Sequence, residues 1–377
     1  MAGRVVLVTG VSRQLAADVA VALARRPEVE CVVGVDAALP RGGPLAAAGV
    51  RVVRADLRSP SVVRVVRETE VDTVVHMAVV TTPRAVGGRV PMKEINVLGT
   101  LHLLASCQKA GGLRRLVVRS SAGVYGAGPA DPAVVAESTE ASRPPRHGWA
   151  RDCVDLEASV RGFARRRPDV AVAMLRYAHA VGPSLRTGFT DLFTLPVVPA
   201  VMGRDGRLQF VHADDVVGSA VAAALGDTAG PVNVAADGVV TVAQAAALAR
   251  RPVMGLPPQM LRRLRRLPGL SGAPDLDEDD IAVLAHGRVL DTTRMRLELG
   301  YECRWTTRTA FEDFVAGRAL HGPGSRPILR GLEQLSHAVT GAGATTAGAG
   351  ATAAAGTGAA TAGAGMTREA GDGSMAP

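Results

Sequence analysis

The sequence predicts an α/β fold built on a doubly wound parallel sheet, and two observations support this prediction. Short apolar runs, of which residues 5–8 are the first, alternate with segments whose apolar residues recur at helical spacing. Strands that are apolar throughout are typical of parallel sheets covered by helices on both faces. Repeated strand–helix units of this length also imply right-handed crossovers, and therefore a parallel sheet.

Composition narrows the class of protein before any motif is considered. The 377 residues are 47% hydrophobic, which is enough for one large domain or two modest ones. The net charge is +8, but the arginines are spread along the chain and only Lys93 and Lys109 are lysines. This skew is typical of a GC-rich genome, so the charge does not indicate nucleic-acid binding.

The sequence also predicts a cytoplasmic protein. No apolar run reaches the roughly 18 residues that a membrane helix needs. The first strand begins too early to leave room for a signal peptide. Four widely spaced cysteines, at positions 31, 107, 153 and 303, match no disulfide or metal-binding framework.

Residues 4–26 are typical of a strand, a tight turn and a helix. Such a turn directs backbone N–H groups and the positive end of the helix dipole to one point, which suits a dinucleotide pyrophosphate. The glycine fingerprint of these turns is incomplete here. Arg13, Gln14 and Ala16 occupy positions where further glycines are expected, and only Gly10 remains.

An acidic residue, Asp36, closes the second predicted strand. At this distance beyond the glycine turn, its carboxylate is placed to accept hydrogen bonds from the adenosine ribose and would repel a 2′-phosphate. A plain turn residue is the alternative interpretation of Asp36. Asp36 therefore makes NAD the preferred cofactor, whereas NADP remains possible because the Arg13 guanidinium could pair with a phosphate.

The later elements continue the alternation. Strands are expected over residues 30–36, 50–55, 71–78, 114–121 and 170–175, and helices over residues 60–68, 93–110 and from 147 onward. Asp56, His76 and Ser121 stand at the carboxyl ends of three of these strands. Since ligands of a parallel sheet bind at that edge, the three residues predict a shared site and a Rossmann-like architecture.

A series of motifs across residues 4–316 resembles the extended short-chain dehydrogenase/reductases. Within them the resemblance is strongest to the NAD-dependent epimerase/dehydratase group, which includes UDP-galactose 4-epimerase, and to actinobacterial UDP-glucose epimerase-like proteins. The order and spacing of the motifs are more specific than any single one. The motifs are Thr9-Gly10, Asp36, Asp56-Leu57, His76-Met77-Ala78, NVLGT at 96–100, SSAGVYG at 120–126, LRYAHAVGP at 175–183, RLQFVHADDV at 207–216, VNV at 232–234 and DTTRMRLELGY at 291–301.

The resemblance implies an NAD(P)-binding Rossmann domain over residues 1–180, to which some later segments return, and a smaller α/β substrate-binding region over residues 181–334. A nucleotide sugar would bind in the cleft, and a homodimer would form through the helix that carries residue 149. Ser121 would be the catalytic hydroxyl, and His179 and Arg207 would contact substrate, with a surface role as the alternative for Arg207. The implied cofactor residues are Gly10, Arg13, Asp36, Asp56, Leu57, His76, Ala78 and Asn96.

The central catalytic pair of the resembled family, a Tyr and a Lys four residues apart, is missing. The residues four beyond the three tyrosines are Pro129, Val181 and Trp305, so no such pair exists anywhere in the chain. Alignment on the helix after residue 147 puts Trp149 at the Tyr position and Cys153 at the Lys position. An indole has no proton that titrates near neutrality, and a neutral thiol supplies no positive charge.

Neighbouring groups could substitute for the missing pair. Arg151 could supply charge, and His147, Asp152 or His179 could move protons, although residues at a helix entrance are usually solvated or capping. Cys153 would need an adjacent base and a lowered pKa to act as a nucleophile, so a small buried residue is the simpler interpretation.

Two hypotheses about function therefore remain open. The first is an NAD(P)-binding family member with altered or reduced catalysis on a nucleotide-sugar-like ligand. The second is a catalytically silent dinucleotide- or ligand-binding protein with a regulatory or scaffold role. The retained Asp36, Asp56 and Ser121 favour a surviving ligand pocket, whereas the lost glycines and the lost Tyr–Lys pair favour loss of enzymatic function.

Three segments toward the end of the chain complete the predictions. The basic stretch 256–270 is bounded by prolines, so a packed surface helix is expected there in preference to membrane contact. The acidic residues 274–280 suit the start of a helix. Residues 335–377 are rich in Ala, Gly and Thr with no periodic apolar face, which predicts a disordered tail.

Overall fold

The computed structural model describes residues 3–39, 43–59, 61–264 and 276–318. Its main element is a seven-stranded sheet with the order β11-β6-β5-β4-β1-β2-β3, in which all pairings are parallel. The predicted fold class is therefore confirmed. The strands are β1 (Arg4–Thr9), β2 (Val29–Asp36), β3 (Arg51–Arg54), β4 (Thr73–His76), β5 (Arg115–Ser121), β6 (Ala171–Tyr177) and β11 (Gly230–Val234).

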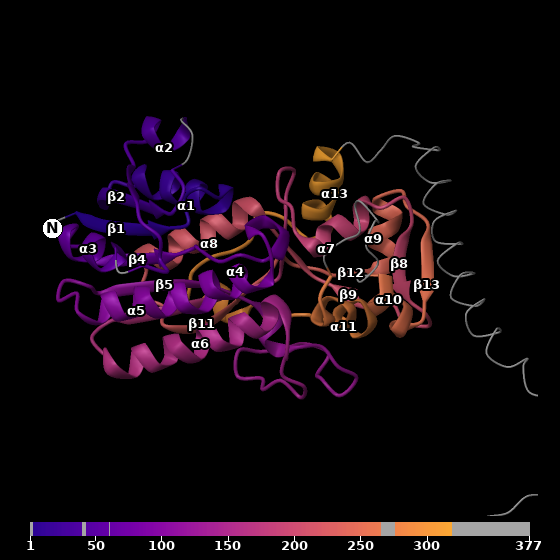
Figure 1. Ribbon diagram of the computed structural model, residues 1–377. Coiled ribbons are helices and arrows are strands. Elements are labelled where there is room, and N and C mark those ends of the chain that lie inside the picture. Colours follow the sequence, from indigo (N-terminus) through magenta and orange to yellow (C-terminus); the bar gives the residue numbers. More distant parts are fainter. Residues whose placement is uncertain (1–2, 40–42, 60, 265–275, 319–377) are drawn as a thin grey trace, which may run out of the picture. The chain divides into compact units, whose positions relative to one another are not determined.

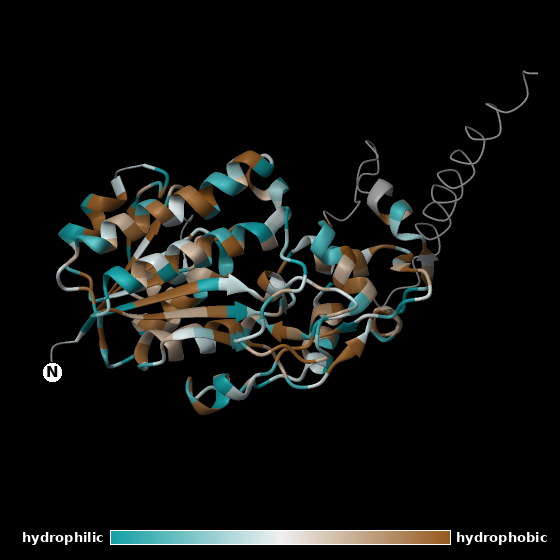
Figure 2. Ribbon diagram, turned by 90° about the horizontal axis from the view of Figure 1, so that it is seen from below, coloured by the Kyte–Doolittle hydropathy of each residue, from teal (hydrophilic) through white to brown (hydrophobic). Residues whose placement is uncertain are grey.

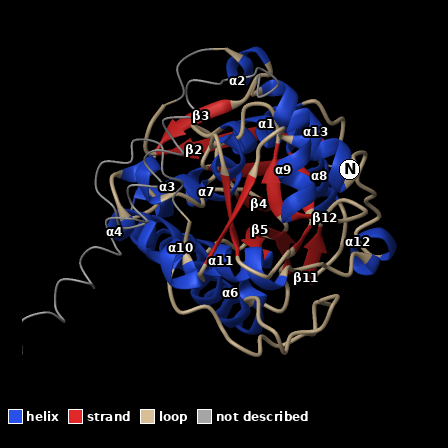
Figure 3. Cartoon of the chain, turned by 90° about the vertical axis from the view of Figure 1, so that its right-hand side faces the viewer, coloured by secondary structure: helices blue, strands red, loops and turns tan. Residues whose placement is uncertain are grey.

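Helices cover both faces of the sheet (Figures 1 and 3). One layer contains α1 (Gln14–Ala24) and α8 (Ala213–Leu225), and the other contains α3 (Ser61–Glu68), α5 (Thr100–Gln108) and α6 (Gly148–Arg166). Val6 and Val8 of β1 pack with the first layer, whereas Leu7 between them packs with the second. This double burial explains why β1 is apolar at successive positions, and Figure 2 shows apolar residues concentrated along the strands.

The helix expected over residues 93–110 begins earlier and is not uniform. Its first part is α4 (Arg89–Lys93), a π-helical turn follows over Glu94–Gly99, and α5 completes it. Within the π-helical turn, the buried Asn96 side chain exchanges hydrogen bonds with the backbone of Val80. Such π-helical turns are typical of places where a helix adapts to a functional site.

Many apolar residues after β6 form a separate cluster, which includes the buried Phe193, Phe210, Phe311 and Phe314. Three two-stranded sheets, β10–β7, β12–β9 and β13–β8, contribute to this part. In contrast, α8 and β11 return to the layers of the large sheet. The remaining elements are α2 (Pro44–Ala47), β7 (His179–Val181), α7 (Gly188–Asp191), β8 (Val198–Val201), β9 (Arg207–Leu208), β10 (Phe210–His212), β12 (Val240–Thr241), α9 (Val242–Leu248), β13 (Val253–Leu256), α10 (Pro258–Leu264), α11 (Glu278–His286), α12 (Thr293–Leu297) and α13 (Thr307–Gly317).

Some predictions reach beyond the described residues. The basic stretch contains the end of β13 and all of α10, but residues 265–270 lie outside the described part, as does the predicted tail at 335–377. The acidic stretch does start a helix, because the Asp277 side chain caps α11. Within the described ranges, no helix combines the length and the apolar character needed to cross a membrane.

Candidate functional site

Two cavities lie at the carboxyl edge of the large sheet. The small cavity has a volume of about 60 Å³. The large cavity has a volume of about 610 Å³ and is lined by residues of β5, β6, α6 and the start of α11. The small cavity brings together six of the eight residues predicted to hold a cofactor, namely Gly10, Arg13, Asp36, Asp56, Leu57 and Ala78.

Gly10 is the turn residue that the small cavity depends on. Its φ of +87° is a conformation that other residues rarely adopt. A Cβ at this position would lie 2.7 Å from the Cα of Ala78, so the β1–α1 turn and the end of β4 can approach closely only with glycine there. No side chain caps the start of α1, so its first backbone N–H groups remain available to a ligand.

The Asp36 carboxylate is oriented by the turn. Its Oδ2 accepts hydrogen bonds from the backbone N–H of Ser12 at 3.0 Å and from the Ser12 hydroxyl at 2.7 Å. Its Oδ1 accepts a longer bond of 3.3 Å from the N–H of Ala38. The remaining lone pairs of this partly exposed carboxylate can accept ligand hydroxyls.

Asp56, on the facing side of the small cavity, is held by a bidentate ion pair. The Arg58 guanidinium donates to its two oxygens at 2.7–3.2 Å, and this pairing lowers the pKa of the Asp56 carboxyl. Asp56 therefore stays ionised, while its hydrogen-bonding capacity toward a ligand is partly used.

His76 and Asn96 lie behind the cavity walls. His76 is fully buried, and its two ring nitrogens bond the hydroxyls of Thr9 and Thr100 at 2.8 and 2.9 Å. Burial lowers the pKa of His76 to about 4, so the ring is neutral near pH 7. The burial of His76 and Asn96 favours a role in supporting the wall of the small cavity. Direct contact of either side chain with a ligand stays a prediction.

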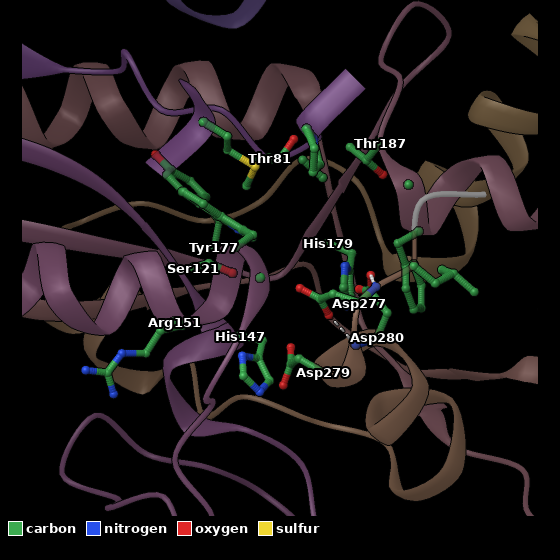
Figure 4. A pocket seen from close by; sticks show the side chains of 18 of the residues that line it. Thr81, Ser121, His147, Arg151, Tyr177, His179, Thr187, Asp277, Asp279 and Asp280 are labelled. Atoms are coloured by element: carbon green, nitrogen blue, oxygen red, sulfur yellow. Dashed lines mark hydrogen bonds between the residues drawn. The ribbon is translucent and has the colours of Figure 1, made fainter. Parts of the chain in front are cut away.

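Ser121 reaches the large cavity from the end of β5 (Figure 4). Its Oγ accepts a hydrogen bond of 3.0 Å from the N–H of Gly123, which leaves the hydroxyl proton free to donate. Gly123 also lets α6 approach, because a Cβ there would lie 2.9 Å from the Cβ of Ala150. The predicted serine and the predicted catalytic helix are thus brought to one cavity.

The opposite wall of the large cavity carries three aspartates, Asp277, Asp279 and Asp280 (Figure 4). The capping box of α11 joins two of them, since each backbone N–H donates to the other's carboxylate at 2.9 Å. Asp279 pairs with the Arg288 guanidinium at 3.1 Å. Burial and the neighbouring Asp279 raise the pKa of Asp277 to about 6. From the sequence, residues 274–280 predict only the start of a helix. No pattern in the neighbouring sequence indicates that α11 packs near α6.

The two predicted substrate residues do not share a cavity. His179 lines the large cavity and stacks on Phe189, with ring centroids 3.8 Å apart. Its Nε2 is buried and has no hydrogen-bond partner among the described residues. Arg207 is exposed and lines a separate cavity of about 300 Å³ together with Arg204. The reason is strand alternation, because the next residue of β9, Leu208, is the one that points inward. His179 and Arg207 therefore line different cavities, and the contact of either residue with a substrate stays a prediction.

Comparison with known proteins places the chain in a family. A model of the NAD dependent epimerase/dehydratase family matches residues 6–235. The chain belongs to this family. An uncharacterised protein of Mycobacterium tuberculosis is 42% identical over 321 residues, which cover 84% of this chain and 85% of that protein. A 3-diazoavenalumate denitrifying reductase of a Streptomyces species is 35% identical over 179 residues, covering 44% of this chain and 56% of that protein.

Solved structures of the family share the fold. The UDP-glucose 4-epimerase of Thermotoga maritima with UDP-glucose has a TM-score of 0.63 at 19% identity, covering 83% of this chain and 98% of that one. The UDP-glucose-4-epimerase of Stenotrophomonas maltophila with bound NAD and formylated UDP-arabinopyranose has a TM-score of 0.64 at 20% identity, covering 84% and 97%.

Trp149 and Cys153, which the sequence predicts at the positions of the family's Tyr–Lys pair, differ in how they meet the large cavity. Trp149 lines the large cavity and is half-buried against the apolar cluster of α5 and α6. Cys153 is fully buried, and burial raises the pKa of its thiol well above the usual value. It is therefore a neutral core residue, as expected, and burial disfavours the thiolate that a nucleophile requires.

The polar groups considered as substitutes are mostly committed elsewhere. Asp152 is fully buried and holds a bidentate pair with the Arg89 guanidinium at 2.5 and 2.8 Å. Arg151 pairs with Asp155 at 2.8 Å. Burial lowers the pKa of His179 to about 3, so this ring stays neutral. His147 is exposed at the entrance of α6 and lines the large cavity.

A buried polar network supports the floor of the site. The Glu157 carboxylate accepts hydrogen bonds from the Ser120 hydroxyl at 2.7 Å and from Arg176 at 2.7 and 2.9 Å. Arg176 also donates to the Tyr125 hydroxyl, which in turn donates to the Asn233 side chain, both at 2.7 Å. The network joins α6, β5, β6 and β11, and thereby fixes the strand end that carries Ser121.

Besides the three aspartates, Arg119 is a charged residue of the site that sequence analysis missed. It lies in β5 and lines the large cavity. The signal available was a charged residue inside the apolar run LVV-R-SS, where a parallel strand normally has none.

Proposed function

We propose that the protein binds NAD across the two cavities and holds a nucleotide-sugar-like ligand in the large one, with catalysis altered by the loss of the Tyr–Lys pair. The observation that carries this proposal is the convergence of Gly10, Arg13, Asp36 and Asp56 on one cavity beside a second that contains Ser121. The family's structural neighbours include epimerases with bound NAD and nucleotide sugars, which supports the same assignment.

The residues present fit such a cofactor. The close approach of Gly10 to Ala78 and the uncapped start of α1 provide a cradle for a diphosphate. Asp36 is held by Ser12 at the edge of the small cavity, where its charge would accept ribose hydroxyls and oppose a 2′-phosphate, which favours NAD over NADP. When bound, the nicotinamide would supply hydride acceptance and donation at the floor of the large cavity.

The chain's own residues would handle the substrate differently from the family pattern. Ser121 would hydrogen-bond a ligand hydroxyl, since its proton is free to donate. Trp149 would contribute an apolar wall and no proton. The carboxyl in this cavity suited to exchange a proton near neutral pH is Asp277, whose pKa burial raises to about 6.

A second candidate is a catalytically silent protein that binds a dinucleotide or another ligand for regulation or scaffolding. The neutral, fully buried Cys153 favours it, because no cation stands at the Lys position of α6. Both candidates predict binding, and only the first predicts turnover.

Assembly and compartment remain proposals as well. We expect a homodimer, and Leu98 and Leu101, which are 48% and 42% exposed beside the first turns of α5, offer apolar surface for it. All four cysteines are free, which supports a reducing cytoplasm.

The decisive experiment is calorimetric titration of the full chain with NAD⁺, NADH, NADPH and UDP-glucose. Asp36→Asn should weaken NAD⁺ binding, and the matched Asp237→Asn, at a side chain 77% exposed and remote from the cavities, should not. Failure of every dinucleotide to bind would refute the first candidate. Binding without turnover over a panel of nucleotide sugars would favour the silent one.

A further inference from the structure

Two arginines from distant parts of the chain each line one of the two cavities and interact electrostatically. Arg13 precedes α1 and lines the small cavity, whereas Arg119 lies near the end of β5 and lines the large one. Both are half-buried. Among the residues that the structure describes, neither guanidinium has an ion-pair or hydrogen-bond partner.

Strand geometry places Arg119 on the α1 side of the sheet. Side chains alternate along β5, so Arg119 shares a face with Val117. Val117 packs in the apolar cluster that contains Leu15 and Val19 of α1. The guanidinium therefore lies on the side of the sheet where the uncapped first turn of α1 begins.

The positive charges of Arg13 and Arg119 are only partly balanced by neighbouring groups. Burial lowers the pKa of Arg119, and the nearby Arg13 lowers it further. Burial also lowers the pKa of Arg13. The negative charge of Asp36 opposes this shift, but Asp36 lies too far away to form an ion pair with Arg13. The two like charges are partly removed from water and have no ion-pair partner among the described residues. They therefore destabilise the ligand-free protein, and a bound anion would relieve this cost.

We propose that Arg13 and Arg119 together clamp the diphosphate of the bound dinucleotide. This inference rests on the proposed function. In this proposal the adenosine half of the dinucleotide lies in the small cavity and the nicotinamide half lies in the large cavity. The diphosphate joins the two halves, so it would pass from one cavity to the other. A guanidinium fork matches phosphate oxygens with two donors, and the first N–H groups of α1 add to it.

The clamp explains how the β1–α1 turn works with a single glycine. In a glycine-rich turn the backbone itself approaches the diphosphate closely. Arg13 and Ala16 prevent the same approach here, because each adds a side chain at the turn. Side-chain charge from two elements takes over the role of the missing backbone contacts, and the phosphate sits farther from the chain.

The test is calorimetric titration of full-length wild type, Arg13→Met and Arg119→Met with NAD⁺, inorganic pyrophosphate and adenosine. Each substitution should weaken NAD⁺ and pyrophosphate binding at least tenfold and leave adenosine binding within twofold. Arg64→Met, at an exposed arginine of α3 that lines neither cavity, is the matched control and should change nothing. Melting temperatures of the ligand-free proteins serve as a second readout, since removing one of two repelling cations should leave them unchanged or raise them.

The outcomes separate this inference from the function on which it rests. NAD⁺ affinity that both variants retain would overturn the clamp and leave NAD binding standing. Absence of dinucleotide binding in wild type would refute the proposed function. If wild type binds pyrophosphate but no dinucleotide, and both arginine variants lose pyrophosphate binding, the anion clamp is still supported. If wild type binds neither, the clamp is overturned together with the proposed function.

Discussion

The Glu157 carboxylate offers the sharpest test of how the site is held in place. It is 1% exposed and accepts hydrogen bonds from Ser120, Arg161 and Arg176. Burial alone would lower the pKa of Arg176, but the hydrogen bonds and charge of Glu157 outweigh burial and raise it. Glu157→Gln keeps the shape of the side chain and removes the charge.

The expected loss follows from what the substitution leaves behind. Arg176 is 7% exposed, so its cation would remain buried, with an amide in place of its counter-ion. Breaking a buried ion pair by removing one partner costs about 3–5 kcal/mol, which lowers the ratio of folded to unfolded protein by a factor of roughly 10²–10³ or more. Hydrogen bonds from Ser120 and Arg161 are weakened as well.

Urea denaturation followed by circular dichroism measures this free energy of unfolding. The matched control is Glu312→Gln, because Glu312 forms an exposed pair with Arg308 at 2.9 Å and should cost less than about 1 kcal/mol. The double variant Glu157→Leu/Arg176→Met should cost less than the sum of its single variants, since it leaves no unpaired charge. A Glu157→Gln loss no larger than the control's would refute the reasoning.

Three further predictions concern the cavities. Gly10→Ala should destabilise the protein more than Gly43→Ala in thermal unfolding; both glycines have positive φ, but only at Gly10 would a Cβ meet backbone. Equal losses would contradict the close contact. Burial raises the pKa of Asp277 from 3.8 to about 6, so the folded state holds a proton there and stability falls as pH rises through this range. Asp277→Asn should therefore remove part of that fall in melting temperature between pH 4 and 7, and an unchanged profile would count against the shift. Cys153→Lys should lower the urea midpoint, because it buries an ammonium near Arg119, and adding Arg119→Met should restore part of the loss; no rescue would show that the two sites are independent.

The fold could be predicted because its determinants are local. Apolar runs and helical spacing identify β1, β2, β4 and β5 and the helices between them, and right-handed crossovers then order the strands. The small cavity followed as well, since Asp36 and Asp56 stand at strand ends, and strand ends of a parallel sheet meet at one edge. The single glycine at position 10 needed the structure to show that it allows the approach of Ala78.

The rest of the site could not be predicted, because it depends on contacts between distant segments. Asp277 reaches the large cavity only because α11 packs near the start of α6, more than a hundred residues earlier in the chain. The side of β9 to which Arg207 points depends on a two-residue strand, where register is not visible in the sequence. Arg119 stands out in the sequence as a charged residue within an apolar strand, but the sequence does not show that its side chain lines a cavity.

The two departures from the family pattern meet at Arg119. Its guanidinium is electrostatically coupled to Arg13, in the β1–α1 turn, and to Cys153, at the position of α6 where the sequence predicts that the family's Lys would stand. Positive charge is thus still present beside the cofactor cradle, on β5 in place of α6. That charge can hold a phosphate, but it cannot lower the pKa of a hydroxyl at position 149, because Trp149 has none. The double substitution Trp149→Tyr/Cys153→Lys would place a second cation beside Arg119. The repulsion between the two cations would lower the stability of the fold, so a gain in catalysis is not expected from this change alone. Adding Arg119→Ser should recover part of the lost stability, but it would also remove half of the proposed clamp and weaken NAD⁺ binding. Turnover by the double variant at wild-type stability would contradict this coupling.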